Sequence, residues 1–385
     1  MLPKLCAETA PILDAELQVE LIPLPELQAL GSMWRRLEAR ADRSFFLSWT
    51  WIGTWLRAID CRPELVIARL SGEVIGLGLM HARLLTRHGL LPVWTLFLHQ
   101  TGDPDQDVIT IEYNDFLADR RYQDEVRSAC LRFLIDRGEC GGREVGELLL
   151  GGLAGERRAD IEALGRPVHA RAEAGSAFVD LDALRQSGKP FLDTLKASSA
   201  RRIRRSIALY RARGALELET AADVDQALDM FERSGALHQT RWTARGHPGA
   251  FAHPFYVAFH RSLIRTALPL AQVELVEVSA AGEPIGYLYN FLDRGRVLYY
   301  FSGFRFESDN RLKPGLVCHS LCIERHLERG MDVYDFMGGD QRYKLELGQR
   351  GPDIIHLAVQ RPNWMLAAER PLRKLKQAIG EVRRR

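Results

Sequence analysis

Two stretches of the chain carry the same short pattern at the same place in a series of elements. Residues 72–77 read GEVIGL, and residues 282–287 read GEPIGY. Each pattern forms a turn between two alternating apolar segments, which predict strands. In both halves helices precede this hairpin, and a strand, a helix and a further strand follow it. The repeated order predicts one α+β unit that occurs twice, each unit with a mixed, mainly antiparallel sheet flanked by helices.

The first half contains signals for three helices and five strands before a Gly- and Ala-rich link that ends near residue 175. Its second helix is rich in aromatic side chains, which we expect in the core rather than on a substrate platform. The predicted helices cover 27–39, 44–59 and 122–138, and the predicted strands cover 64–70, 74–83, 93–99, 108–118 and 147–150.

The second half repeats these signals. Asp223 has the character of an N-cap, and Pro314 suits the first turn of a helix. The predicted helices cover 191–213, 224–242, 254–268 and 314–328, and the predicted strands cover 272–279, 284–292, 297–304, 331–337 and 354–360. We therefore expect an N-terminal unit at 1–180, a C-terminal unit at 181–362 and a basic helical tail at 363–385.

Composition excludes several classes of protein. The apolar fraction is 46% and the net charge is +2, which are values of an ordinary globular chain without a global signal for binding polyanions. No run approaches the length of a transmembrane helix, and the first residues resemble no signal peptide. Scattered cysteines without a CxxC pair predict a reducing cytoplasm. Cys318 and Cys322 share an apolar helix with two histidines, so we expect core packing there and no metal site.

The stretch 331–348 reads MDVYDFMGGDQRYKLELG. An apolar strand is followed by two glycines and then by an acid, an amide, two bases and a phenol. Polar groups that directly follow a rigid strand are typical of a functional site. On this pattern alone, a solvated loop is an equal alternative.

Several motifs together resemble a known family. They are SSARRIRR at 198–205, LHQTRW at 237–242, Gly315 with its helix, YDFMGGDQRYK at 334–344 and FFLSWTW at 45–51. The chain resembles the CelD-like acyltransferases of cellulose and exopolysaccharide biosynthesis. These are GNAT-superfamily enzymes related to the FemAB-type aminoacyltransferases, which pair two GNAT-like units. The resemblance covers about residues 30–360.

The resemblance implies a catalytic arrangement in the second half. A bulged central strand at 298–303 would offer a backbone N–H to the acyl carbonyl, with Tyr300 and Ser302 beside it. Lys344, which follows Tyr343, would stabilise developing negative charge. Asp340 would take a proton from the attacking group or orient the lysine.

The resemblance also implies that an acyl-CoA pyrophosphate is held at the start of the helix near 314. Arg311 and Lys313 would supply charge there, and Gly315 would allow close approach. This loop contains one glycine where the family pattern has two. Acyl-CoA, with acetyl-CoA as the simplest case, and aminoacyl-tRNA therefore both stay open as donors.

Two further groups of side chains are candidates for binding. His238 and Arg241 lie three residues apart, so they share one face of a helix, where they would act as a base and a phosphate ligand. Trp242 is expected in the core. Arg201 and Arg205 belong to a basic run that either is a solvated helix or clamps a phosphorylated, lipid-linked or sugar-linked acceptor. The tail at 363–385 either docks on the body or contacts an anionic inner-membrane surface.

These observations predict an acyltransferase that moves an acyl group to an amine or hydroxyl of a cell-envelope or exopolysaccharide precursor by direct attack. One alternative is an aminoacyl-tRNA-dependent transferase of the FemAB type. Another is a non-catalytic GNAT-fold module of a polysaccharide-synthesis assembly. The balanced net charge argues against other nucleic-acid partners.

Overall fold

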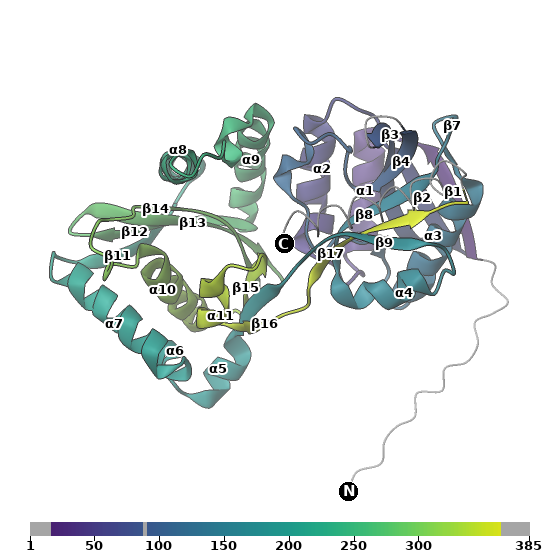
Figure 1. Ribbon diagram of the computed structural model, residues 1–385. Coiled ribbons are helices and arrows are strands. Elements are labelled where there is room, and N and C mark those ends of the chain that lie inside the picture. The colour runs from purple at the N-terminus through teal and green to yellow at the C-terminus, as the bar shows by residue number, and fades with distance from the viewer. Residues whose placement is uncertain (1–16, 88–90, 363–385) are drawn as a thin grey trace, which may run out of the picture.

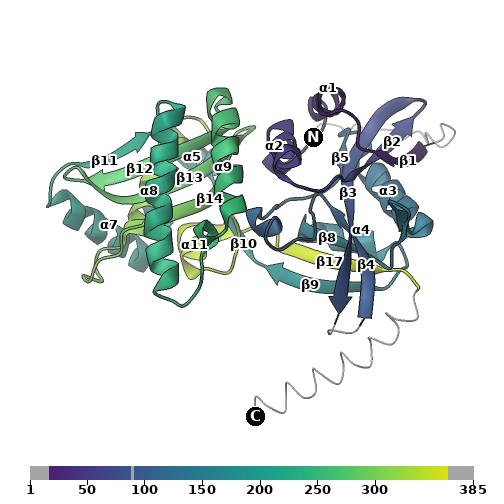
Figure 2. The ribbon, with the colours of Figure 1, turned by 90° about the horizontal axis from the view of Figure 1, so that it is seen from above.

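The computed structural model describes residues 17–87 and 91–362, so the predicted tail at 363–385 lies outside the described residues. The described strands form two large sheets in separate halves of the molecule (Figures 1 and 2). The first sheet contains β1 (Leu17–Pro23), β2 (Glu64–Leu70), β3 (Glu73–Arg87), β4 (Leu91–Leu98), β8 (Glu147–Ala154), β17 (Ile354–Gln360) and β9 (Val168–Ala174), in that spatial order, with β5 (Leu117–Ala118) beside β3.

The second sheet has the matching arrangement. It contains β11 (Leu216–Thr220), β12 (Val273–Ala280), β13 (Glu283–Asp293), β14 (Arg296–Phe304), β15 (Val333–Gly338), β10 (Ser176–Asp180) and β16 (Gln349–Arg350), in that spatial order. In each sheet a strand, two helices, three antiparallel strands, a helix and a parallel strand follow one another along the chain. The predicted repeat and the predicted α+β class are both confirmed.

Helices cover both faces of each sheet. The matching helices are α1 (Leu27–Glu38), α2 (Trp49–Ala58) and α3 (Gln123–Arg137) in the first unit and α8 (Val224–Thr243), α9 (Pro254–Ala267) and α10 (Pro314–Glu328) in the second. Figure 1 shows α8 and α9 on one face of the second sheet and α10 with α7 (Ala197–Arg211) on the other. The shorter helices are α4 (Arg158–Glu162), α5 (Leu181–Ser187), α6 (Phe191–Thr194) and α11 (Arg342–Leu347). None of the helices within the described ranges is long and apolar enough to cross a membrane.

The two units exchange strands reciprocally. The strand β10 follows the first unit along the chain, but it pairs with β15 in the second sheet. The strand β17 follows the second unit, but it pairs with β8 and β9 in the first sheet. The predicted division at residue 181 assigns β10 to the N-terminal unit and β17 to the C-terminal unit. In the structure β10 belongs to the second sheet and β17 to the first.

Three local predictions were wrong. The predicted strand at 108–118 is mostly irregular, because Thr110 and Tyr113 have positive φ values of 22° and 50°. The Gly- and Ala-rich link contains β9, whose partner β17 lies about 180 residues away in the sequence. The polar loop after β15 contains α11, in which Leu347 is buried and anchors the helix.

Aromatic side chains join the two units. The ring of Phe45 stacks on that of Phe291 of β13 with centroids 4.5 Å apart, and Trp51 meets Phe259 of α9 edge-on at 4.9 Å. All four side chains are at most 1% exposed. The expectation that the aromatics at 45–55 pack in the core is confirmed for Phe45 and Trp51, and their core lies between the units.

Replacing Phe291 with alanine is expected to lower the free energy of unfolding by about 3–5 kcal/mol, because the cavity would open in this shared core. Urea denaturation followed by tryptophan fluorescence measures the change. Leu270→Ala is the control, since Leu270 is 58% exposed and its loss should change stability by less than about 0.5 kcal/mol. Equal effects of the two substitutions would contradict the shared core.

Candidate active site

The two central strands of the second sheet separate part-way along their length. The strand β14 pairs in parallel with β15 only over Arg296–Leu298. On its other side β14 contains a bulge, because Tyr289 faces Phe301 while Asn290 faces Tyr299, which leaves Tyr300 as the extra residue. A bulge was predicted within 298–303. The matching pair in the first unit, β3 and β4, keeps a regular register, so the candidate site lies in the second unit.

Two cavities meet where the strands separate. The larger has a volume of about 580 Å³ and lies between α8, β14 and the start of α10. The smaller has a volume of about 270 Å³ and lies between β14, the end of β15, α11 and the segment 108–112 of the first unit. Both are lined by Tyr299, Tyr300, Phe301, Gln341 and Tyr343. A molecule in each cavity would therefore meet the other at the bulge.

The larger cavity contains cations without carboxylate partners. Arg241, Arg245 and Lys313 line it, and within the described ranges no acidic side chain pairs with them. The guanidinium of Arg241 lies 3.8 Å from the centroid of the Phe306 ring. Burial, followed by the charge of Arg245, lowers the pKa of Arg241. These cations favour an anionic ligand, since one would relieve their mutual repulsion.

The start of α10 faces the same cavity. No side chain caps this helix end, and Pro314 and Gly315 both line the cavity. The N–H groups in the first turn of a helix lack partners within the helix and form an anion site. A Cβ atom at Gly315 would lie 3.1 Å from the Phe304 ring, so the glycine keeps this approach open.

A row of hydroxyl groups crosses the floor of the larger cavity. The hydroxyls of Tyr343 and Tyr299 share a hydrogen bond, and Tyr299 Oη lies 2.6 Å from Ser302 Oγ. Burial raises the pKa of both tyrosines, which keeps them protonated. His238 packs on Phe301 at 4.6 Å. Burial lowers the pKa of His238 to about 4, against a smaller rise from the Ser302 backbone, so it is neutral at pH 7.

The smaller cavity holds a buried lysine and a buried carboxyl group. Lys344 is 4% exposed, and its Nζ donates to the carbonyl of Gly338 at 2.6 Å and to that of Met337 at 3.3 Å. Burial lowers the pKa of Lys344 to about 8, although Glu112 and two aspartates oppose the shift. Burial raises the pKa of Glu112 to about 7, against the Gly338 N–H and the charge of Lys344. Both groups therefore titrate near neutral pH.

The first unit supplies Glu112 through a strained loop. Glu112 Oε2 accepts a hydrogen bond from the Gly338 N–H at 2.7 Å. The adjacent Tyr113, at positive φ, donates its hydroxyl to Asp335 of β15 at 2.9 Å. Positive φ costs conformational energy in residues other than glycine, and such residues often occur at functional sites. Sequence reasoning missed Glu112, because it lies in a segment read as a strand and its partner is 226 residues away.

Several predicted site residues lie outside both cavities. Asp340 is exposed, and its Oδ1 accepts the N–H of Gly175 at 2.9 Å. Arg311 is held by Asp309 at 2.7 Å. Arg201 and Arg205 are exposed on α7. By contrast Lys344, Tyr343, His238, Arg241, Lys313, Gly315, Ser302 and Tyr300 all line one or both cavities.

The structure also shows the positions of Trp242 and Tyr300. Trp242 was expected in the core, but it is 36% exposed and lines the larger cavity. It lies in the last turn of α8, where the helix extends beyond the second sheet. The hydroxyl of Tyr300 donates to the carbonyl of Ile109 at 2.8 Å, so this side chain also links the two units.

Three potential metal ligands on β12 and α10 belong to an ion-pair network. Glu274, Cys322 and His326 place ligand atoms within 4.8 Å of one another. Glu274 already binds His326 at 2.5 Å, Asn290 at 3.0 Å and Arg329 at 2.9 Å. These contacts satisfy the carboxylate, and the burial of the network in the core indicates a structural role.

A protein-family model matches the part of the chain that contains most of these residues. Residues 197–345 match the model of the acetyltransferase (GNAT) domain. This part of the chain is therefore similar to GNAT acetyltransferase domains. The matched residues include α8, β14, the start of α10 and Lys344, which together form most of both cavities. The narrower CelD-like resemblance stays a prediction, and no curated protein is similar enough in sequence to be matched.

Solved structures show the same fold at low identity. FemX is 11% identical with a TM-score of 0.58, over 89% of this chain and 97% of FemX. The C-terminal domain of a proposed lysylphosphatidylglycerol synthetase from Agrobacterium fabrum is 13% identical with a TM-score of 0.52, over 89% and 95%. L-PGS from Bacillus licheniformis is 12% identical with a TM-score of 0.50, over 91% and 98%. At this identity the comparisons show that the two units together share the fold of these proteins.

Proposed function

We propose that the protein transfers an acyl group from a donor in the larger cavity to an amine or hydroxyl in the smaller one, by direct attack. The observation that carries this proposal is the meeting of the two cavities at the bulge of β14. Beyond Leu298 this strand has no pairing with β15, so the backbone N–H groups on that side of the strand are available to an oxyanion. One such donor typically lowers the barrier by about 3 kcal/mol.

The buried pair in the smaller cavity suits the acceptor. Glu112 would take the proton that the attacking nitrogen or oxygen loses as it bonds to the acyl carbon. Lys344 has one N–H beyond the two that it donates to carbonyls. That N–H would stabilise the negative charge of the tetrahedral intermediate. When the bond to the leaving group breaks, the hydroxyls of Tyr343, Tyr299 and Ser302 would supply its proton.

The donor that this arrangement supports best is acyl-CoA. The first turn of α10 and the unpaired Arg241 and Lys313 would hold phosphate groups, and the apolar wall at Phe301 and Phe304 would take the pantetheine arm. The CelD-like resemblance suggests an acceptor among cell-envelope or exopolysaccharide precursors, on the cytoplasmic side of the membrane. No metal enters this proposal.

Aminoacyl-tRNA is the second candidate donor. The specific observation in its favour is that Pro314 removes one backbone N–H from the first turn of α10. The single Gly315 also allows the backbone to approach a pyrophosphate closely at fewer positions than a two-glycine loop does. The similarity of the fold to FemX is consistent with this alternative. The similarity of the fold to L-PGS is consistent with a lipid acceptor.

Isothermal titration of the purified protein with acetyl-CoA, CoA and aminoacyl-tRNA tests the donor. We expect saturable binding of acetyl-CoA, with release of free thiol when a panel of amino sugars and amino acids is added. Tight binding of aminoacyl-tRNA without binding of acetyl-CoA would support the second candidate. Absence of binding for both donors would contradict transfer and favour a non-catalytic module.

Arg241→Gln should weaken acetyl-CoA binding by about 10- to 100-fold, since a hydrogen bond to a charged group contributes about 1.5–3 kcal/mol. The Kd from titration measures this effect. Arg233→Gln is the matched control, because Arg233 lies on the same helix but pairs with Glu277 at 3.2 Å and lines neither cavity. A similar loss in both variants would show that the helix, rather than the Arg241 charge, is affected.

A further inference from the structure

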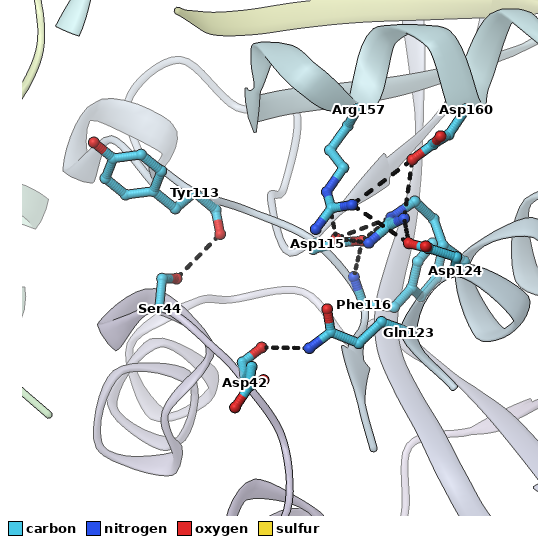
Figure 3. Close-up of polar contacts among 10 residues, drawn as sticks. Asp42, Ser44, Tyr113, Asp115, Phe116, Gln123, Asp124, Arg157 and Asp160 are labelled. Atoms are coloured by element: carbon cyan, nitrogen blue, oxygen red, sulfur yellow. Dashed lines mark hydrogen bonds and ion pairs between the residues drawn. The ribbon is translucent and has the colours of Figure 1, made fainter. Parts of the chain in front are cut away.

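A third cavity lies between the two units, away from the bulge of β14. Its volume is about 410 Å³, which is within the range of small-molecule sites. Figure 3 shows the charged cluster of Asp115, Asp124, Arg157 and Asp160 on one side of this region, with Ser44 and Tyr113 on the other. The second unit contributes Asp293, Arg294, Arg296 and Leu298 to the lining.

The acidic side chains of this lining are already neutralised or face solvent. Arg127 makes three hydrogen bonds to Asp115, the shortest at 2.6 Å. Arg43 holds both oxygens of Asp293 at 2.8 Å. The side chain of Asp42 is 69% exposed, and Glu156 is exposed. Each carboxylate of the lining is therefore either paired with an arginine or open to solvent.

Arg157 is the more loosely held of the two arginines in the cluster. Its closest approaches to Asp115, Asp124 and Asp160 are 3.7, 3.4 and 3.8 Å. Arg127 approaches the same three acids at 2.6, 2.8 and 3.1 Å. Because Arg127 takes the close positions, the guanidinium of Arg157 keeps hydrogen-bonding capacity for another anion.

Three more arginines contribute unused donors. Arg294 donates to the carbonyls of Ala41 and Glu38, and no carboxylate in the described part of the chain pairs with it. Arg296 pairs with Asp335 at 3.0 Å, and its side chain is 48% exposed. The side chain of Arg43 is only 5% exposed, yet its Nε is buried without a partner. Such an unsatisfied buried donor is costly unless a ligand completes it.

We propose that this third cavity, lined by Arg43, Arg157, Arg294 and Arg296, binds a phosphorylated small molecule or headgroup. Guanidinium groups bind phosphate oxygens in a bidentate manner, and here they come from both units. An anion would therefore hold the units together. The proposal does not depend on the acyl transfer proposed above, because neither cavity at the bulge includes these arginines.

Titration calorimetry with inorganic pyrophosphate tests this site. We expect saturable binding that weakens as salt is raised, and at least about a tenfold loss in Arg157→Gln. The matched control is Arg158→Gln, since the adjacent Arg158 pairs with Glu173 at 2.7 Å and does not line the cavity. Arg241→Gln is a second control, because the larger cavity at the bulge also attracts anions.

Retained affinity in Arg157→Gln would overturn the proposal, as would a loss confined to Arg241→Gln. Absence of pyrophosphate binding at millimolar concentration would overturn it too, unless vesicles containing phosphatidylglycerol bind. Co-sedimentation with such vesicles, compared with pure phosphatidylcholine vesicles, distinguishes a lipid headgroup from a free phosphate. In that arm as well, Arg157→Gln must lose binding while Arg158→Gln keeps it.

Discussion

Replacing Lys344 with methionine is expected to lower kcat/KM for acyl transfer by about 100- to 1000-fold, as the loss of one oxyanion donor does in other acyl-transfer enzymes. Methionine preserves most of the volume of the buried chain but removes the ammonium group. The carbonyls of Met337 and Gly338 lose their donor, so a modest loss of stability is also expected. Initial rates of thiol release, measured below the melting temperature of each variant, give the effect on catalysis.

The neighbouring Arg342 provides the control for Lys344. It lies on the same helix, α11, and its side chain is 91% exposed and contacts Glu346 at 3.2 Å. Arg342→Met should retain nearly full activity. If Lys344→Met kept the activity of the unchanged protein while folding normally, Lys344 would have no part in the reaction.

Glu112→Gln is expected to lower kcat by about 100- to 10,000-fold, the usual contribution of a general base. The pH profile gives a second measure. Glu112 can accept a proton only when ionised, so activity should rise as the pH passes its pKa of about 7. Lys344 is useful when protonated, so activity should fall as the pH passes its pKa of about 8. The unchanged protein should therefore have a bell-shaped profile.

The two variants should remove different limbs of this profile. Glu112→Gln should lose the rise on the acidic side, and Lys344→Met should lose the fall on the alkaline side. Glu112→Asp shortens the side chain by one methylene but keeps the acid, and partial recovery of the rate would separate proton transfer from a purely structural contact with Gly338. A profile that is unchanged in Glu112→Gln would contradict its role as the base.

The repeat could be predicted because its signals are local. The turn residues at 72–73 and 282–283, the Asp223 cap and Pro314 each act within a few residues. The strand exchange could not be predicted in the same way. Local sequence signals identify β17, and β10 is a short apolar run. The partner of each strand, however, is determined by pairing between residues that lie far apart in the sequence.

The residues of the candidate site also differ in whether local sequence signals could identify them. Lys344, Tyr343 and Arg241 could be selected because they belong to motifs within the second half, and they do line the cavities. Glu112 could not, since an acid within an alternating stretch carries no signal until the loop at 110–113 is seen against β15. Arg311 was selected for its place before a helix, but the nearby Asp309 neutralises it.

The reciprocal strand exchange also constrains how the protein is made. The strand β9 is held in the first sheet by β17, which the ribosome adds about 180 residues later. Until then β8 exposes one edge, which β17 later covers. The sheet of the N-terminal unit therefore remains incomplete, with an edge open to incorrect pairing, until β17 has been synthesised. Neither unit contains every strand of its own sheet, so each unit needs the other to complete its fold.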